Sequence, residues 1–241
     1  MADYLHHMLF GIYPYIALVI LAVGSIIRYD REPYSWRAGS SQLLRRRQLM
    51  WGSVLFHVGV LVIFFGHLGG LLTPIWVFDA LGIPHGAKQI LAIVAGGIAG
   101  VMAIIGATLL IHRRFFDPRI RAASSFSDNM TILLLWVQLA LGLATIPLSL
   151  GHLDGHEMVK FMNWAQGIFT FNSDAAGFIR DAHIVFKLHL FLGLTILLLF
   201  PFTRLVHMLS APVRYIWRGG YQIVRSRHLR NGAPAKQVRH G

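Results

Sequence analysis

Four of the 13 histidines lie inside long apolar segments, where an ionisable side chain is costly and usually has a function. They are His57, His67, His189 and His207. Imidazole is the usual axial ligand of a b-type haem, which two histidines on facing helices hold without a covalent bond to the protein. The residue type and its apolar setting therefore predict that these four side chains bind haem iron.

The spacing of the four histidines predicts two haems stacked across a membrane. On an ideal α-helix, His57 and His67 are about 15 Å apart along the axis, whereas His189 and His207 are about 27 Å apart. Because the two segments run in opposite directions, equal depth pairs His57 with His207, and His67 with His189. The two separations differ by about 12 Å, so we expect helix tilt and a kink at Pro201 to absorb the difference.

The composition argues against several other classes of protein. Of the 241 residues, 55% are hydrophobic and 13% are charged, which is typical of a chain surrounded mainly by lipid. The net charge of +12 would suggest nucleic acid in a soluble protein, but here the basic residues lie between apolar segments, so we expect no nucleic-acid partner. Because the chain has no cysteine, it holds neither a cysteine-ligated iron–sulfur cluster nor a c-type haem.

Five apolar segments are long enough to cross a bilayer as helices, which takes about 20 residues. The predicted spans are Met8–Ile27, Leu49–Leu72, Ile90–Ile111, Met130–Leu150 and Ile184–Met208. Their apolar runs are continuous, without the alternation of barrel strands, and none contains Asp or Glu. The expected fold is therefore an all-α integral membrane bundle, and residues 1–210 are interpreted as one transmembrane domain.

Lysine and arginine are distributed unevenly among the connecting segments. All but four of the 22 lie between the first two spans, between the third and fourth, or at the C-terminal end. The exceptions are Lys88, Lys160, Arg180 and Lys187. Cytoplasmic segments carry the basic excess, so we predict the N-terminus outside, the C-terminus in the cytoplasm, and residues 211–241 as a basic tail that contacts partner subunits. His57 and His207 then lie toward the cytoplasm, and His67 and His189 toward the outside.

The segment between the fourth and fifth spans contains two further signals. Glu157–Ile168 is predicted to form a short amphipathic helix at the membrane surface, with Trp164 as an interfacial anchor. The sequence GHLDGHEM places His152, Asp154 and His156 close together; a solvated loop is the favoured interpretation and a metal site is the alternative. The stretch HEMVK has a lysine where a zinc protease has its second histidine, which argues against that chemistry.

Glycines near the histidines have two interpretations. Gly59 follows the inner histidine of the second span, and Gly66, Gly69 and Gly70 lie beside the outer one. Without side chains, these positions would not obstruct a flat macrocycle. Glycine also lets helices pack closely in a membrane, so packing remains the alternative.

A proton- or cation-coupled transporter is the alternative from a different functional class. Such proteins normally carry membrane-embedded carboxylates or broken helices at the midplane. The predicted spans contain no acidic residue, which favours the haem protein. Bound haem, visible as a Soret band, separates the two interpretations.

Several stretches of the sequence resemble the gamma subunit of membrane-bound respiratory nitrate reductase, a di-haem cytochrome b. The resemblance extends from about Gly11 to Arg227. It is carried by GIYPYIA, RYD followed by WRAGSSQ, LFHVGVLVIFFGHLGGLLTPIW, DNMTILLLWVQLALGLATIPLSLGHLDGHEMVKFMNWAQ, and KLHLFLGLTILLLFPFTRLVH with APVRY.

The resemblance implies a quinol-oxidising subunit of an oxidoreductase in the bacterial cytoplasmic membrane. Such a subunit holds two haem b groups, releases protons outside, and passes electrons to an iron–sulfur beta subunit and a molybdenum alpha subunit, where nitrate is reduced. An equivalent cytochrome b subunit of another reductase remains an alternative.

The resemblance also implies roles for individual residues. Histidines matching His57 and His207 hold the haem nearer the catalytic subunits, and those matching His67 and His189 hold the distal haem. A lysine matching Lys88 assists quinol oxidation beside the distal haem. Gly66 is expected in the same neighbourhood. For Lys88, the alternative is a lysine that anchors the start of the third span.

Overall fold

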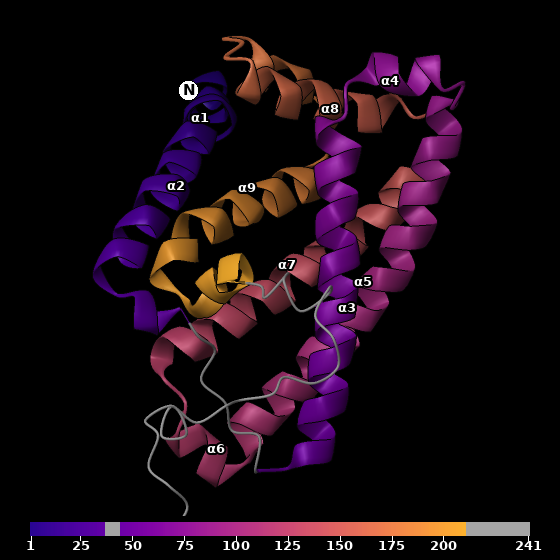
Figure 1. Cartoon of the computed structure of the whole chain (residues 1–241). Coiled ribbons are helices and arrows are strands. Elements are labelled where there is room, and N and C mark those ends of the chain that lie inside the picture. Colours follow the sequence, from indigo (N-terminus) through magenta and orange to yellow (C-terminus); the bar gives the residue numbers. More distant parts are fainter. Residues whose placement is uncertain (37–43, 211–241) are drawn as a thin grey trace, which may run out of the picture.

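The computed structural model describes residues 1–36 and 44–210, and within these ranges the regular structure is entirely helical (Figure 1). Among the described residues, five helices are long and apolar enough to cross a membrane, which confirms the predicted all-α membrane bundle. They are Asp3–Arg31, Arg46–Leu72, His85–Phe116, Phe126–Leu150 and Ile184–Phe202. The tail predicted to contact partner subunits, residues 211–241, lies outside the described residues.

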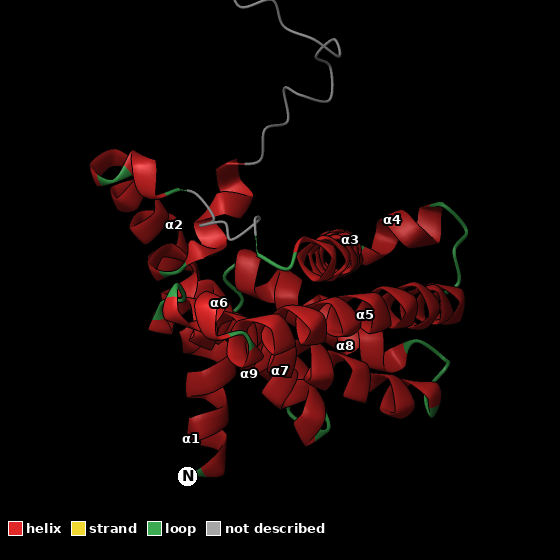
Figure 2. Cartoon of the chain, turned by 90° about the horizontal axis from the view of Figure 1, so that it is seen from below, coloured by secondary structure: helices red, strands yellow, loops and turns green. Residues whose placement is uncertain are grey.

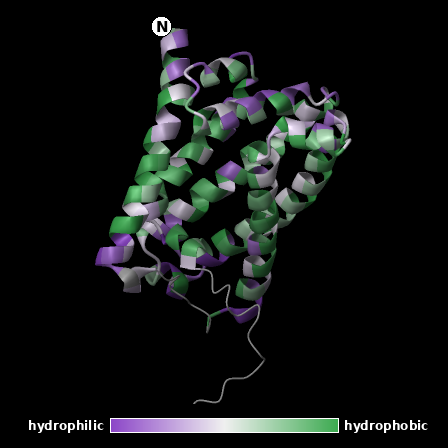
Figure 3. Ribbon diagram, turned by 45° about the horizontal axis from the view of Figure 1, so that its top comes forward, coloured by the Kyte–Doolittle hydropathy of each residue, from purple (hydrophilic) through white to green (hydrophobic). Residues whose placement is uncertain are grey.

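Short helices join and cover the spanning helices. In chain order the elements are α1 (Ala2–His7), the π-helical turn η1 (Met8–Ile12), α2 (Tyr13–Arg31), the 3-10 turn η2 (Pro33–Ser35), α3 (Arg46–Leu72), α4 (Ile75–Ala80), α5 (His85–Phe116), α6 (Pro118–Ala122), α7 (Phe126–Leu150), α8 (His156–Phe169), the 3-10 turn η3 (Ala175–Ile179), α9 (Ile184–Leu199), and the 3-10 segments η4 (Phe200–Phe202) and η5 (Arg204–Ser210). Helices α4 and α8 lie at one end of the bundle and α6 lies at the other (Figure 1). Hydrophobic residues follow the spanning helices, and hydrophilic residues gather toward the two ends (Figure 3).

Helices α3 and α5 lie side by side in both views of the bundle (Figures 1 and 2). A Cβ atom added at Gly59 of α3 would lie 2.5 Å from the carbonyl oxygen of Ala99 in α5. Gly106 of α5 likewise has no room for a side chain against the backbone of Phe56. Small residues let the two backbones approach closely. The interpretation of Gly59 as room for a macrocycle is therefore wrong, because its open side is filled by α5.

Helix α8 crosses the end of the bundle where the chain begins (Figure 1). It coincides with the predicted amphipathic segment, but Trp164 is only 5% exposed, and its Nε1 donates to the carbonyl oxygen of Phe10 at 2.9 Å. Ile168 is buried in the same cluster as Phe10. The prediction of Trp164 as an interfacial anchor is therefore wrong, because tertiary packing gives the indole nitrogen an acceptor inside the protein.

The fifth predicted span is not one continuous α-helix to Met208. The α-helix ends at Leu199, and the chain continues as η4 and η5, with Thr203 extended between them at φ −116° and ψ 178°. Pro201 has no backbone N–H and disfavours helical geometry at the residue before it. The proline was expected to kink the helix, but it lies where the helix breaks. His207 is consequently carried by a 3-10 segment.

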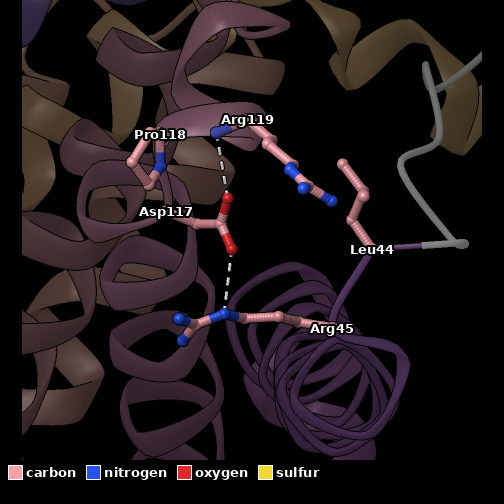
Figure 4. A pocket seen from close by; sticks show the side chains of 5 residues that line it. All are labelled: Leu44, Arg45, Asp117, Pro118 and Arg119. Atoms are coloured by element: carbon pink, nitrogen blue, oxygen red, sulfur yellow. Dashed lines mark hydrogen bonds and ion pairs between the residues drawn. The ribbon is translucent and has the colours of Figure 1, made fainter.

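An ion pair joins Asp117, the residue before α6, to Arg45, the residue before α3 (Figure 4). The carboxylate of Asp117 accepts hydrogen bonds from the backbone N–H groups of Arg119 and Ile120, and it pairs with Arg45 at 2.9 Å. Desolvation acts to raise the pKa of Asp117, but the two N–H groups and the Arg45 guanidinium together hold it below its usual value. The carboxylate is thus charged at neutral pH.

Candidate functional site: two pairs of facing imidazoles

The structure brings the four histidines of the apolar segments together as two pairs. The ring centres of His57 and His207 are 6.4 Å apart with 71° between the ring planes, and we call these residues the inner pair, after the side of the membrane predicted for them. The ring centres of His67 and His189 are 6.2 Å apart with 51° between the planes, and these form the outer pair. Helix α3 carries one member of each pair; the partners lie on η5 and α9. The pairing matches the expected one, and iron binding stays a prediction.

The separation within each pair suits one metal ion between the rings. An imidazole nitrogen binds a transition metal at about 2 Å, so two nitrogens on opposite sides of one ion are about 4 Å apart. The ring centres lie farther apart than the nitrogens by the two distances from nitrogen to ring centre. The observed 6.2 and 6.4 Å meet this requirement. Both pairs therefore fit the axial ligand set of a b-type haem.

Backbone carbonyls orient three of the four imidazoles. In each case Nδ1 lies within hydrogen-bond distance of a carbonyl oxygen in the preceding turn of its own segment. The pairs are His57 with Ser53 at 2.7 Å, His67 with Ile63 at 2.8 Å, and His207 with Arg204 at 2.5 Å. Because a carbonyl accepts and does not donate, Nδ1 carries the hydrogen, and the lone pair on Nε2 is left for a metal.

His189 is seated against α7 by a glycine that the sequence analysis did not identify. A Cβ atom added at Gly142 would lie 3.0 Å from Cε1 of the His189 ring. Any side chain at this position would therefore push the imidazole or shift the helix. The glycine was missed because it lies on a different helix, far from His189 in the sequence.

Open space lies along α3 beside the outer pair. A Cβ atom added at Gly66, Gly69 or Gly70 would meet nothing within 4 Å. The tight packing at Gly59 is the opposite case. The sequence analysis gave two alternatives for these glycines, and both occur along α3. Gly59 allows close helix packing, whereas Gly66 leaves open space.

Lys88 points into the protein near the start of α5. It is 7% exposed, and its Nζ donates to the carbonyl oxygen of Gly70 at 3.2 Å. The same atom lies 2.9 Å from Sδ of Met162 in α8 and 3.6 Å above the ring centre of Phe78 in α4. Gly70 follows His67 by about one helical turn, so the ammonium group lies near the end of α3 that carries His67. Sequence reasoning found Lys88 but missed Phe78 and Met162, which come from two separate covering helices.

His152, in the loop before α8, and His156, the first residue of α8, are not gathered into a metal site. His156 is largely exposed and lies 3.9 Å from a carboxylate oxygen of Asp154, while His152 contacts the carbonyl of Leu148 at 3.3 Å. Among the described residues, which include this whole loop, no group of three or more His, Cys, Asp or Glu side chains is placed to hold a metal ion. The alternative of a metal site here therefore has no support.

The fold and the site define a class of protein: a helical membrane bundle that presents two pairs of facing imidazoles at two levels along one helix. Comparison with protein families identifies the class more closely. The profile described as "Nitrate reductase gamma subunit" matches residues 6–227. The chain belongs to the nitrate reductase gamma subunit family.

Relatives from different bacteria match over nearly their whole length. The chain is 48% identical to "Respiratory nitrate reductase 1 gamma chain" of Escherichia coli (strain K12), with 94% of this chain and 100% of that protein covered. It is 49% identical to "Respiratory nitrate reductase 2 gamma chain" of the same strain, with the same coverage. It is 39% identical to "Nitrate reductase gamma chain" of Bacillus subtilis (strain 168), with 91% of this chain and 98% of that protein covered. These matches confirm the family predicted from the segments around the histidines.

Proposed function

We propose that this chain is the quinol-oxidising, di-haem cytochrome b subunit of a respiratory nitrate reductase. The observation that carries the proposal is the pairing of four imidazoles at separations of 6.2 and 6.4 Å inside a membrane bundle of the gamma subunit family. His57 and His207 hold the inner haem, and His67 and His189 hold the outer haem. Each haem, when bound, carries one electron at a time.

The chain is oriented with its α6 end in the cytoplasm and its α8 end outside. The connection between α5 and α7 carries basic residues, and the connection that precedes α3 carries more. Because cytoplasmic segments carry the basic excess, the inner pair faces the cytoplasm. Electrons therefore move from the outer pair toward the inner pair, across the bacterial cytoplasmic membrane.

Lys88 binds a quinol oxygen at the outer end. An ammonium group has three N–H donors, and the carbonyl of Gly70 and the sulfur of Met162 account for two of them. The third N–H is available to an oxygen of the substrate. Phe78 covers one side of the ammonium group, so the covering helices limit the access of water. Gly66 leaves open space beside the same end of α3.

Two partner subunits accept the electrons on the cytoplasmic side. This chain has no cysteine to ligate an iron–sulfur cluster, so such clusters belong to a beta subunit, and the molybdenum centre that reduces nitrate belongs to an alpha subunit. The names of the relatives, as gamma chains of nitrate reductase, support this assignment. Co-purification of this chain with a large molybdenum protein tests it.

Replacing one inner ligand tests the haem assignment. The His57→Ala variant removes one of the two imidazoles that would hold the inner haem, so we expect one haem per chain where the wild type has two. The outer haem should remain reducible by quinol. The measurement is the haem content per chain in a pyridine haemochrome assay on the purified complex.

A histidine outside both pairs provides the matched control. His112 lies near the end of α5 and contacts the side chain of Gln48 at 3.1 Å. His112→Ala should retain both haems. Two haems per chain in His57→Ala would refute the ligand assignment, and a colourless, iron-free wild-type complex that still oxidises quinol would refute the whole proposal.

A further inference from the structure

His207 differs from the other three paired histidines because it does not lie on an α-helix. It follows the break at Pro201 and belongs to the 3-10 segment η5. The hydrogen bonds of a 3-10 helix have poorer geometry than those of an α-helix. The position of this imidazole therefore depends also on contacts that hold its segment from other helices.

Arg28 of α2 makes the first of these contacts. Its Nη1 donates to the carbonyl oxygens of Pro201 at 2.7 Å and Thr203 at 2.8 Å, and its Nε donates to Oγ of Ser35 at 3.0 Å. The two carbonyls lie at the break between α9 and η5, and an unsatisfied backbone carbonyl is costly in a membrane. Pro201 also packs on α2 at Gly24, where an added Cβ atom would lie 2.9 Å from the proline ring. One guanidinium group thus fixes the course of the chain that leads to His207.

The second contact comes from α7. The carboxylate of Asp128 binds the guanidinium of Arg204 in a bidentate ion pair, with Nε–Oδ1 at 2.6 Å and Nη2–Oδ2 at 2.5 Å. Both side chains are at most one quarter exposed. The backbone carbonyl of the same Arg204 accepts the hydrogen bond from Nδ1 of His207 at 2.5 Å. Asp128 therefore fixes the residue whose carbonyl orients the imidazole.

We propose that Arg28 and the Asp128–Arg204 pair are positioning residues for His207 that set the orientation of its imidazole and hence the properties of the inner haem. We call them the two clamps. The inference rests on the proposed inner haem site, because it assigns these side chains to the support of one of its ligands. Hydrogen bonds to the second nitrogen of a ligating imidazole fix its plane and its basicity, and loss of such support typically weakens metal binding by about 10- to 100-fold.

Asp128→Asn tests the second clamp in the complete membrane complex. Asparagine has the same shape but lacks the charge and the second acceptor oxygen. The low-field g value of a low-spin haem depends on the angle between its axial imidazole planes, so the electron paramagnetic resonance signal of the inner haem should shift. The signal of the outer haem should stay unchanged. In detergent, excess apomyoglobin should remove the inner haem about 10-fold faster than from the wild type.

Two further variants separate positioning from charge. Asp117→Asn removes an equivalent carboxylate at the same end of the bundle, where it pairs with Arg45 and does not support His207. It should leave both haem signals unchanged. Asp128→Glu retains a carboxylate, so the electron paramagnetic resonance signal of its inner haem should lie close to that of the wild type. Equal shifts in the Asp117 and Asp128 variants would overturn the proposal, because they would reflect surface charge alone.

The first clamp has its own matched pair of variants. Arg28→Gln removes the donor to the two carbonyls, whereas Arg31→Gln alters an exposed arginine one turn further along α2. Only Arg28→Gln should shift the inner signal, and it carries the test if Asp128→Asn does not accumulate in the membrane. An unchanged inner-haem signal in Arg28→Gln would overturn the role of Arg28. An unchanged inner-haem signal in Asp128→Asn would overturn the role of the Asp128–Arg204 pair. A wild-type complex without haem would refute the proposed function, whereas a two-haem complex with an insensitive inner haem refutes only this inference.

Discussion

The inner and outer pairs consist of the same residue type, histidine, on different structural supports. Both members of the outer pair lie on α-helices, and His189 is seated against Gly142 of the neighbouring helix. The inner pair combines His57 of α3 with His207 on a 3-10 segment that side chains hold from two other helices. The outer imidazoles are thus carried by continuous α-helices, whereas the segment that carries His207 of the inner pair is contacted by the side chains of Arg28 and Asp128. We therefore expect single polar substitutions to alter the imidazole orientation in the inner pair more than in the outer pair.

The surroundings of the two pairs differ as well. The outer end is covered by α4 and α8, which pack Phe78 and Met162 around the ammonium group of Lys88. The inner end carries the ion pairs Arg45–Asp117 and Arg204–Asp128. In the proposed function, the covered end suits an apolar substrate with polar oxygens, and the charged end suits an exchange of electrons with other proteins.

A substitution that moves α3 should disrupt both pairs together. In Gly59→Leu, the new side chain collides with the backbone of α5, and overpacking of this kind costs about 1–3 kcal/mol. Because α3 carries His57 and His67, both haems should be lost together, which a pyridine haemochrome assay per chain measures. Gly96→Leu, at a site on α5 where an added Cβ atom meets nothing within 4 Å, should retain both. Retention of two haems in Gly59→Leu would contradict the packing assigned to α3 and α5.

Removing the buried ammonium group should affect the outer end without loss of haem. Lys88→Ala lacks a charged donor, and a hydrogen bond to a charged group contributes about 1.5–3 kcal/mol. Quinol turnover should therefore fall about 10- to 100-fold, while dithionite still reduces both haems. The measurement is the steady-state rate of quinol oxidation by the membrane complex.

A second lysine at the same end controls for charge. Lys160 lies on α8 and donates to Glu157, a hydrogen bond that raises the pKa of its ammonium group, so Lys160 is charged at neutral pH. Lys160→Ala should leave quinol turnover close to that of the wild type. Unchanged turnover in Lys88→Ala would remove Lys88 from the quinol site.

The smallest expected effect is a change in the outer haem alone. In Gly142→Ala, one added carbon lies 3.0 Å from the ring of His189, so the imidazole must turn or shift by a few tenths of an ångström. The low-field g value of the outer haem should move, while that of the inner haem stays constant. Gly96→Ala serves as the control at an open position. A shift confined to the inner haem would mean that the two signals had been assigned to the wrong pairs.

The sequence allowed us to predict the five membrane-spanning segments and the pairing of their histidines. The five spans follow from hydropathy, because a bilayer requires a continuous apolar run whatever the neighbouring helices are. The pairing of His57 with His207 and of His67 with His189 followed from depth along antiparallel segments. The mismatch of about 12 Å in ideal spacing pointed to Pro201, but the outcome was a broken helix in place of a kinked one.

The sequence by itself determined that this is a helical membrane protein with histidines at two depths, because hydrophobicity and helical rise act locally along the chain. Tertiary structure alone decided that Trp164 is buried, that Gly142 seats an imidazole, and that Arg28 holds the backbone near Pro201. Each of these contacts joins residues on different helices. Their partners are set by how the helices pack, and a single sequence carries no local signal for that arrangement.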